Sequence, residues 1–188
     1  MFANAGYRLE TYREYIEKIF LQEPDLYAFR PMAPNHPRIA TFVYADVPEQ
    51  GYTTSLTYGL SEYDNPAWVG GRPELILSVA SARENWGSAT GLAAARFQLD
   101  SDFAYGDILD FEQPISDDSA MQAFVLFAPA ILEKADYQAI KLDYYNVNMV
   151  GMYPIYKEEI TTIKTIGLER FMHHPDYDMY SVTRKVIR

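Results

Sequence analysis

The sequence predicts an α+β fold: a single domain, residues 1–188, in which an antiparallel or mixed β-sheet is flanked by about three to four helices. Strand-like segments are grouped between helix-like segments and do not alternate with them regularly. The chain of 188 residues suits one domain, because domains average ~150 residues. Hydrophobic residues make up 48% of the chain and aromatic residues 15%, a composition too apolar for a disordered protein.

The first half of the chain predicts one helix followed by three strands. A helix is expected over Tyr7 to Leu21, because apolar residues recur there at three- and four-residue spacing and Pro24 limits its far end. The Pro-rich stretch 29–37 is expected to be a loop, since proline lacks a backbone donor. Period-two alternation over Tyr52 to Leu60 is typical of a half-buried strand. The three expected strands are Ile39 to Ala45, Tyr52 to Leu60 and Glu74 to Ala80.

The second half predicts two further helices and three further strands. A helix is expected over Trp86 to Leu99, where Gly87 and Gly91 would allow close packing. Another is expected over Pro154 to Ile166, with proline at the first helical position and an exit at Gly167. The strands expected between these helices are Ala123 to Phe127, Gln138 to Leu142 and Tyr145 to Tyr153.

Composition excludes several classes of function. The chain carries 16 Lys+Arg against 26 Asp+Glu, a net charge of −10, which argues against a nucleic-acid partner. With no cysteine, a disulfide, a thiolate metal site and a cysteine nucleophile are all excluded. The strongest apolar run, Ala123 to Leu132, is shorter than the ~20 residues that a membrane helix needs. The N-terminus has no signal-peptide core, so we expect a cytoplasmic protein without a membrane partner.

Patterns typical of enzymes are missing from the sequence. It contains no P-loop, no G-x-G-x-x-G and no G-x-S-x-G, so we expect no enzymatic activity and no cofactor. One alternative is a metal-dependent hydrolase that uses His173, His174 and Asp176. Adjacent histidines point in divergent directions, which favours helix capping over metal binding for this group.

Acidic residues accumulate in one central segment. No Lys or Arg occurs between Arg96 and Lys134. Such a segment either keeps the protein in solution as a hydrated loop or docks a basic partner, whose approach it could accelerate by ~10–1000-fold. The candidate partner-binding residues are Asp100, Asp102, Asp107, Asp110, Glu112, Asp117 and Asp118.

Several segments, in a consistent order, resemble the suppressor of fused domain family. They cover about Thr53 to Arg184 and include a "GLS" turn, an "ELxL" strand, a "GDxI" strand and a strand-to-helix "PIxxxE" pattern. In this sequence these are Thr57-Tyr-Gly-Leu-Ser61, Glu74-Leu-Ile-Leu77, Leu92-Ala-Ala-Ala-Arg-Phe97, Gly106-Asp-Ile-Leu109, Val150-Gly-Met-Tyr-Pro-Ile-Tyr-Lys-Glu-Glu-Ile160 and a closing Asp178 to Arg184 element.

The resemblance is to the single-domain bacterial form and implies an α+β fold that binds protein and is not enzymatic. It implies an immunity protein that binds and neutralises a bacterial toxin, and we expect that toxin domain to be basic. A general regulator that binds peptides by strand addition stays open as an alternative. Tyr58 and Trp68, near the "GLS" turn, are candidate groove aromatics, although such rings are commonly packing residues.

Overall fold

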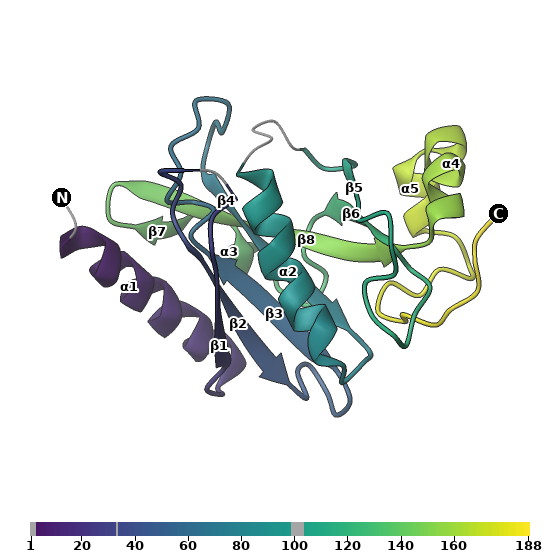
Figure 1. Ribbon diagram of the computed structural model, residues 1–188, viewed down its shortest axis with the longest axis horizontal. Helices are drawn as coiled ribbons and strands as arrows, with labels where there is room; N and C mark the ends of the chain where they lie inside the picture. The colour runs from purple at the N-terminus through teal and green to yellow at the C-terminus, as the bar shows by residue number, and fades with distance from the viewer. Residues whose placement is uncertain (1–2, 33, 99–103) are drawn as a thin grey trace.

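The computed structural model describes residues 3–32, 34–98 and 104–188, and joins all of their strands in one sheet (Figure 1). These residues form five helices and eight strands, which confirms the predicted α+β class. In chain order the elements are α1 (Ala3–Phe20), β1 (Asp25–Phe29), β2 (Ile39–Ala45), β3 (Thr53–Tyr58), β4 (Arg72–Val79), α2 (Glu84–Phe97), β5 (Ile108–Asp110), β6 (Ala123–Phe127), α3 (Lys134–Tyr137), β7 (Ile140–Leu142), β8 (Tyr145–Ile155), α4 (Lys157–Ile166) and α5 (Leu168–Met172).

The sheet is mixed, with strand order β1-β2-β3-β4-β8-β6-β5. All neighbouring strands are antiparallel except β4 and β8, which run parallel. The long strand β8 has two partners on its other side: β7 pairs with its first residues and β6 with its last five. Strand β8 therefore links the N-terminal hairpins to the C-terminal part of the molecule.

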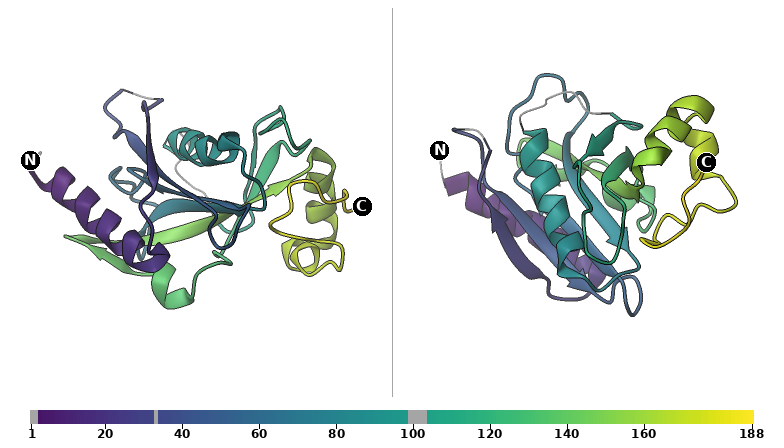
Figure 2. Two further views of the ribbon diagram at one scale, coloured as in Figure 1. Left: turned by 90° about the horizontal axis from the view of Figure 1, so that it is seen from below. Right: turned by 45° about the vertical axis from the view of Figure 1, so that its right-hand side comes forward.

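Helices cover both faces of the sheet. Helix α2 packs Trp86 and Ala93 on one face, in a cluster with Leu75 and Phe124. Helix α1 packs Tyr12 against the opposite face, and Figure 2 shows the two helices on opposite sides of the strands. Helices α4 and α5 form a third cluster with the ends of β6 and β8. None of the helices in the described ranges combines the length and the apolarity needed to cross a membrane.

Strand β3 is buried on both faces, so the expectation of a half-buried strand is wrong. All six of its residues are buried, because α1 and α2 cover its two sides. Its polar residues satisfy their hydroxyls internally: Thr53 donates to the Ser81 carbonyl at 2.6 Å, and Ser55 lies 2.5 Å from the Thr90 hydroxyl. Period-two alternation indicates two different faces, but it does not say that the polar face meets water.

The two glycines of α2 let the helix approach the sheet closely, as their spacing predicted. A Cβ on Gly87 would press on the side chain of Val43. A Cβ on Gly91 would overlap the ring of Phe29 and the hydroxyl of Thr41. The helix can therefore lie across β1 and β2 only where these positions carry no side chain.

Pro154 lies in a strand and does not begin a helix, which corrects the sequence prediction. It pairs with Phe124 of β6 and lies beyond Met152, the last residue of β8 that pairs with β4. Its missing donor is harmless there, because a proline is tolerated where one side of a strand is unpaired. Helix α4 begins three residues later, at Lys157, and the Glu159 carboxylate accepts the Tyr156 backbone N–H at 2.9 Å.

Three elements of the structure have no counterpart in the sequence prediction: β1, α3 and α5. Strand β1 includes Phe29, which the prediction assigned to the Pro-rich loop. Helices α3 and α5 have four and five residues, too few to show a helical period. Strand β5 has only three residues, yet it lies at the position that the "GDxI" resemblance indicated.

Candidate docking surface

The buried carboxylate of Glu74 accepts hydrogen bonds from the "GLS" turn and holds it in place. Glu74 is fully buried on β4, and its Oε1 accepts the backbone N–H groups of Gly59 and Ser61 at 2.8 and 2.9 Å. The Ser61 hydroxyl donates to the same oxygen, and the Thr57 hydroxyl donates to Oε2, both at 2.6 Å. Burial raises the pKa of Glu74, while these hydrogen bonds oppose the rise. The "GLS" and "ELxL" residues thus form an internal support for the turn.

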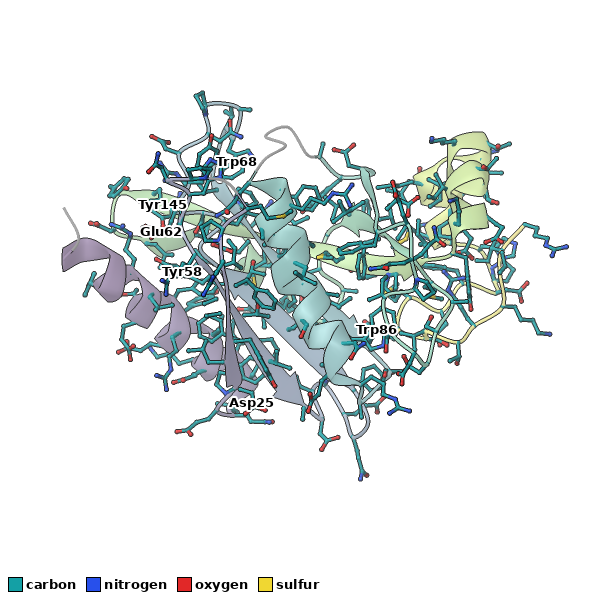
Figure 3. The ribbon with its side chains drawn as sticks, viewed as in Figure 1. Asp25, Tyr58, Glu62, Trp68, Trp86 and Tyr145 are labelled. Atoms are coloured by element: carbon teal, nitrogen blue, oxygen red, sulfur yellow. The ribbon has the colours of Figure 1, made fainter. Side chains whose placement is uncertain are left out.

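A second network fixes the same turn to α1. The Arg8 guanidinium donates to both oxygens of Glu62 at 2.7 Å. The hydroxyls of Tyr58 and Tyr145 donate to Glu62 Oε1 at 2.5 and 2.9 Å, and Figure 3 labels these three residues. Burial acts to raise the pKa of Glu62, but the hydrogen bond from Arg8 and those from the two tyrosines outweigh it and lower the pKa. Tyr58, a candidate groove aromatic, is only 5% exposed and packs against Tyr12.

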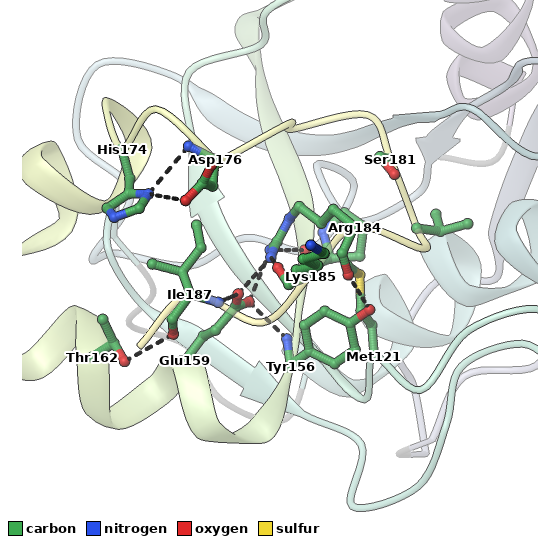
Figure 4. A network of polar contacts seen from close by, with 12 residues as sticks. Met121, Tyr156, Glu159, Thr162, His174, Asp176, Ser181, Arg184, Lys185 and Ile187 are labelled. Carbon is green, nitrogen blue, oxygen red and sulfur yellow. Dashed lines mark hydrogen bonds and ion pairs between the residues drawn. The ribbon is translucent and has the colours of Figure 1, made fainter.

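The third polar network joins α4 to the end of the chain. Arg184 donates to both oxygens of Glu159, at 2.5 and 2.8 Å, and the Ile187 backbone N–H donates to Oε1 at 2.9 Å (Figure 4). The side chains of this pair are 4% and 0% exposed. The two residues from the "PIxxxE" and closing motifs therefore hold the C-terminal segment against α4.

Trp68, the other candidate groove aromatic, does line a hollow. It lies in the loop between β3 and β4 and shares this hollow with Tyr105, Asn148 and Val150. Val69, beside it, is 92% exposed. Tyr58 does not line the same hollow, so the structure separates the two rings that the sequence analysis grouped.

The histidine cluster does not assemble as a metal site. His173 Nδ1 lies 2.7 Å from the carbonyl oxygen of Glu169, which is the contact of a helix-capping residue. His174 Nδ1 accepts the Asp176 backbone N–H at 3.2 Å and lies 3.9 Å from its carboxylate. In the described ranges, no three His, Asp or Glu side chains are placed to hold a metal ion.

The acidic segment runs beside α2 in the opposite direction. Arg96, near the C-terminal end of α2, donates to the Asp110 carbonyl at 2.7 Å. Trp86, near its beginning, donates its indole N–H to the Asp118 carboxylate at 3.1 Å. These two helix residues are ten positions apart, so the segment spans about 15 Å of the helix. Asp100 and Asp102 lie outside the described residues.

Two of the predicted residues have internal partners. Asp118 accepts hydrogen bonds from the Ser81 hydroxyl at 2.6 Å and from Trp86. Burial acts to raise the pKa of Asp118, but the hydrogen bonds it receives lower it. Asp117 is exposed and pairs with Arg83 at 3.5 Å. Both residues help to join the acidic segment to the start of α2.

Three predicted residues, Asp107, Asp110 and Glu112, carry carboxylates that form no ion pair in the described part of the chain. Asp107 accepts the Ala104 N–H, and Asp110 accepts the Glu112 N–H, both at 2.7 Å. These local bonds shape the turns around β5 and leave the charges unneutralised. We call these three residues, with the grooves on either side of them, the acidic docking surface.

The acidic docking surface includes two grooves, each lined by both apolar and polar residues. The groove toward α2 is lined by Leu92, 49% exposed, with Phe111 and Ile115. The groove toward α4 lies between β5 and α4 and is lined by Ile160, Lys164 and the acidic residues Asp107 and Asp110. The surface therefore offers apolar contact and negative charge together, which suits noncovalent docking.

Folding moderates the negative charge that the sequence displays. Three cations lie beside the acidic segment: Arg83 just before α2, Arg96 in α2 and Lys164 in α4. The described carboxylates of that segment are the five of Asp107, Asp110, Glu112, Asp117 and Asp118. These cations and the groove residues Leu92 and Ile160 were not predicted from the sequence to lie at this surface. Their positions follow from tertiary packing, since Ile160 lies about fifty residues beyond β5 in the chain. A slight acidic excess remains, beside two grooves that are partly apolar.

A protein-family model matches most of the chain. A model described as "Suppressor of fused protein (SUFU)" matches residues 34–184. The matched residues include β2 to α5 and both Glu74 and Glu159. A search of curated proteins found no match.

Solved structures with this architecture carry the same family name. The chain is similar to a putative suppressor of fused homologue from Neisseria gonorrhoeae FA 1090, at 15% identity and a TM-score of 0.70, with 94% of each chain covered. It is also similar to a chain of the Sufu–Fu complex, at 12% identity and a TM-score of 0.65, covering 95% of this chain and 91% of that one. Drosophila Suppressor of Fused gives 12% identity and a TM-score of 0.65, covering 95% of this chain and 50% of that one.

Proposed function

The chain belongs to the suppressor of fused family, and from this premise we propose that it is a non-enzymatic protein-binding domain, most specifically an immunity protein that neutralises a bacterial toxin. One relative has been solved in the Sufu–Fu complex, so protein binding is documented for that protein. The proposal treats residues 1–188 as a single domain of this family. The domain would inactivate the toxin by noncovalent binding alone, without breaking a covalent bond.

The observation that carries the proposal is the acidic docking surface. The family-motif residues Glu74, Glu159 and Arg184 are occupied by internal partners, so they support the fold and leave binding to other surfaces. Asp107, Asp110 and Glu112 carry charge without an ion pair among the described residues, and apolar side chains such as Leu92 and Ile160 line the grooves beside them. The partner that fits is a protein segment whose apolar side chain enters a groove while flanking Lys or Arg side chains meet the carboxylates.

Electrostatic attraction is expected to contribute modestly to the rate of association. The cations Arg83, Arg96 and Lys164 offset part of the acidic charge. We therefore expect the gain in association rate to lie near the lower end of the ~10–1000-fold range that surface charge produces. Exposed charges are screened over ~8 Å at physiological ionic strength, so added salt should remove this gain.

The test begins with the partner. The tagged chain is used to capture proteins from its native cell, and any toxin gene encoded beside it is expressed with and without the chain. We expect a captured protein with a basic domain, and we expect co-expression to restore growth to cells that make the toxin. If the captured partner is not toxic, or if growth is not restored, the immunity role is wrong.

Two variants of equal charge then locate the surface. Asp107→Asn, Asp110→Asn and Glu112→Gln together remove three charges and keep an acceptor oxygen at each position. Glu10→Gln, Glu14→Gln and Glu23→Gln remove three exposed charges from α1 and the turn that follows it. The first variant should slow association about tenfold at low salt and little at high salt, whereas the second should match the wild type. Equal rates for both variants would exclude the acidic docking surface.

A further inference from the structure

Strand β1 forms one outer edge of the sheet. It pairs with β2 over five consecutive residues, and in the described part of the chain no strand pairs with its other side. Figure 2 shows β1 at the margin of the sheet, away from α4 and α5. An edge of this kind presents unpaired N–H and C=O groups to another strand.

Three of the usual protections against edge pairing are missing within β1: lysine, proline and a bulge. Residues Asp25–Phe29 contain no lysine and no proline, and their register with β2 shows no bulge. Leu26 is 61% exposed and Tyr27 is 38% exposed. Nine large hydrophobic side chains are exposed in the described residues, and four of them fall within residues 21–32. These four are Leu21, Leu26, Tyr27 and Met32.

The strand is complementary to itself when one copy is reversed. We propose that the β1 strands of two copies of this chain pair antiparallel, centred on Tyr27, in a two-fold dimer with one continuous sheet. This register uses all five residues of both strands. It sets Tyr27 against Tyr27 of the second copy, Leu26 against Ala28, and Asp25 against Phe29, so no like charges oppose each other.

A second copy fits this edge better than an unrelated strand of greater length. Pro24 and Pro31 bracket β1 closely, and a proline that continues an edge strand has no N–H to donate to a new partner strand. A strand with the same two limits ends where β1 ends. Leu26 lies on the α1 face and Tyr27 on the α2 face, so the pairing would cover apolar surface on both sides of the sheet.

This inference is independent of the acidic docking surface. The residues of β1 precede the segment 34–184 that the family model matches. They also lie on the strand farthest in the sheet order from β5, which carries Asp110. Two copies joined through β1 would leave both acidic docking surfaces free.

Sedimentation velocity over a range of protein concentrations tests the dimer. The wild type should sediment as a dimer at high concentration. Tyr27→Lys and Tyr27→Glu each place like charges opposite one another across the two-fold axis, so each should raise the dimer dissociation constant about tenfold or more. Tyr7→Lys is the matched control: this tyrosine is 66% exposed on α1, and its variant should dimerise like the wild type.

Mixing the two Tyr27 variants tests the register. Only a pairing centred on Tyr27 brings the new lysine and the new glutamate together, so the mixture should regain a dimer that neither variant forms alone. Circular dichroism spectra and thermal unfolding of the variants check that the monomers are folded. A monomeric wild type, dimers of both Tyr27 variants, or a mixture that stays monomeric would each overturn the proposal.

Discussion

The Glu62 carboxylate has partners from three separate parts of the chain: Arg8 in α1, Tyr58 in β3 and Tyr145 in β8. A half-buried carboxylate is costly without such donors, because burial disfavours its charged form. Arg8 supplies the largest compensation, with two hydrogen bonds of 2.7 Å. A single side chain therefore links the first helix to the strand that carries the "GLS" turn.

We predict that Arg8→Met destabilises the protein by about 2 kcal/mol at pH 7, the scale of a lost hydrogen bond to a charged group. The folded pKa of Glu62 lies below its ordinary value of 4.5, so its stabilising effect is present above that value and is lost as pH falls through the lowered pKa. The variant should therefore lose less stability on acidification than the wild type. Urea unfolding at pH 7 and at several values below pH 5 measures both effects. Parallel stability curves for the two proteins would contradict this role of Arg8.

The neighbouring residues Glu158 and Glu159 have opposite environments. Glu158 is exposed, whereas Glu159 is fully buried against Arg184. Sequence alone marks both as acids near the start of a helix, where the helix dipole favours them. Their different roles depend on Arg184, which lies 25 residues beyond Glu159 in the chain. No local sequence pattern predicts that contact.

We predict that Glu159→Gln destabilises the protein by about 3 kcal/mol, because it leaves the Arg184 guanidinium buried without its counter-charge. Glu158→Gln is the matched control and should stay within about 0.5 kcal/mol of the wild type. Chemical denaturation of both variants gives the comparison. Equal stabilities would mean that the pair contributes nothing to the fold.

At the scale of elements, the period of the sequence predicts the long helices and strands well. The bounds of β2 and β6 agree with the predicted strands, Ile39 to Ala45 and Ala123 to Phe127. The prediction fails where an element is short or where tertiary contacts override local preference. Pro154 illustrates the second case: it suits a helix start locally, but pairing with β6 keeps it in a strand.

The packing of α2 gives a prediction about glycine. Gly91→Ala should destabilise the protein by about 1–3 kcal/mol, because the new methyl group would overlap Phe29 and Thr41. This loss would occur although alanine favours helix by about 1 kcal/mol over glycine. Gly6→Ala in α1 is the control, since nothing lies within 4 Å of its Cβ position, and it should be neutral or stabilising. Thermal unfolding of the two variants measures the difference in stability. A stabilised Gly91→Ala variant would contradict the prediction and show that Phe29 and Thr41 move to make room for the methyl group.

At the scale of the whole molecule, the topology decides which predicted residues meet. Seven acidic residues were predicted to act together because they are near one another in the chain. The structure gives Asp117 and Asp118 internal partners and leaves Asp107, Asp110 and Glu112 without an ion pair among the described residues. The grooves beside them depend on α2 and α4, which the sheet brings to either side of one segment. Charge can be counted in a sequence, but the cations that moderate it come from distant elements.

An acidic surface kept for binding should cost the folded state some stability, because like charges repel when the chain is compact. We predict that Asp107→Asn, Asp110→Asn and Glu112→Gln together raise the free energy of unfolding by about 0.5 kcal/mol at low salt. Five described carboxylates lie beside three cations there, so repulsion exceeds attraction. The gain should shrink as salt screens the charges over a shorter distance. Denaturation in 20 mM and 500 mM salt measures it, with the Glu10, Glu14 and Glu23 variant as a control of equal charge. If the first variant is less stable than the wild type at low salt, the three carboxylates stabilise the fold. That result would contradict the proposal that their charge is kept for binding a partner.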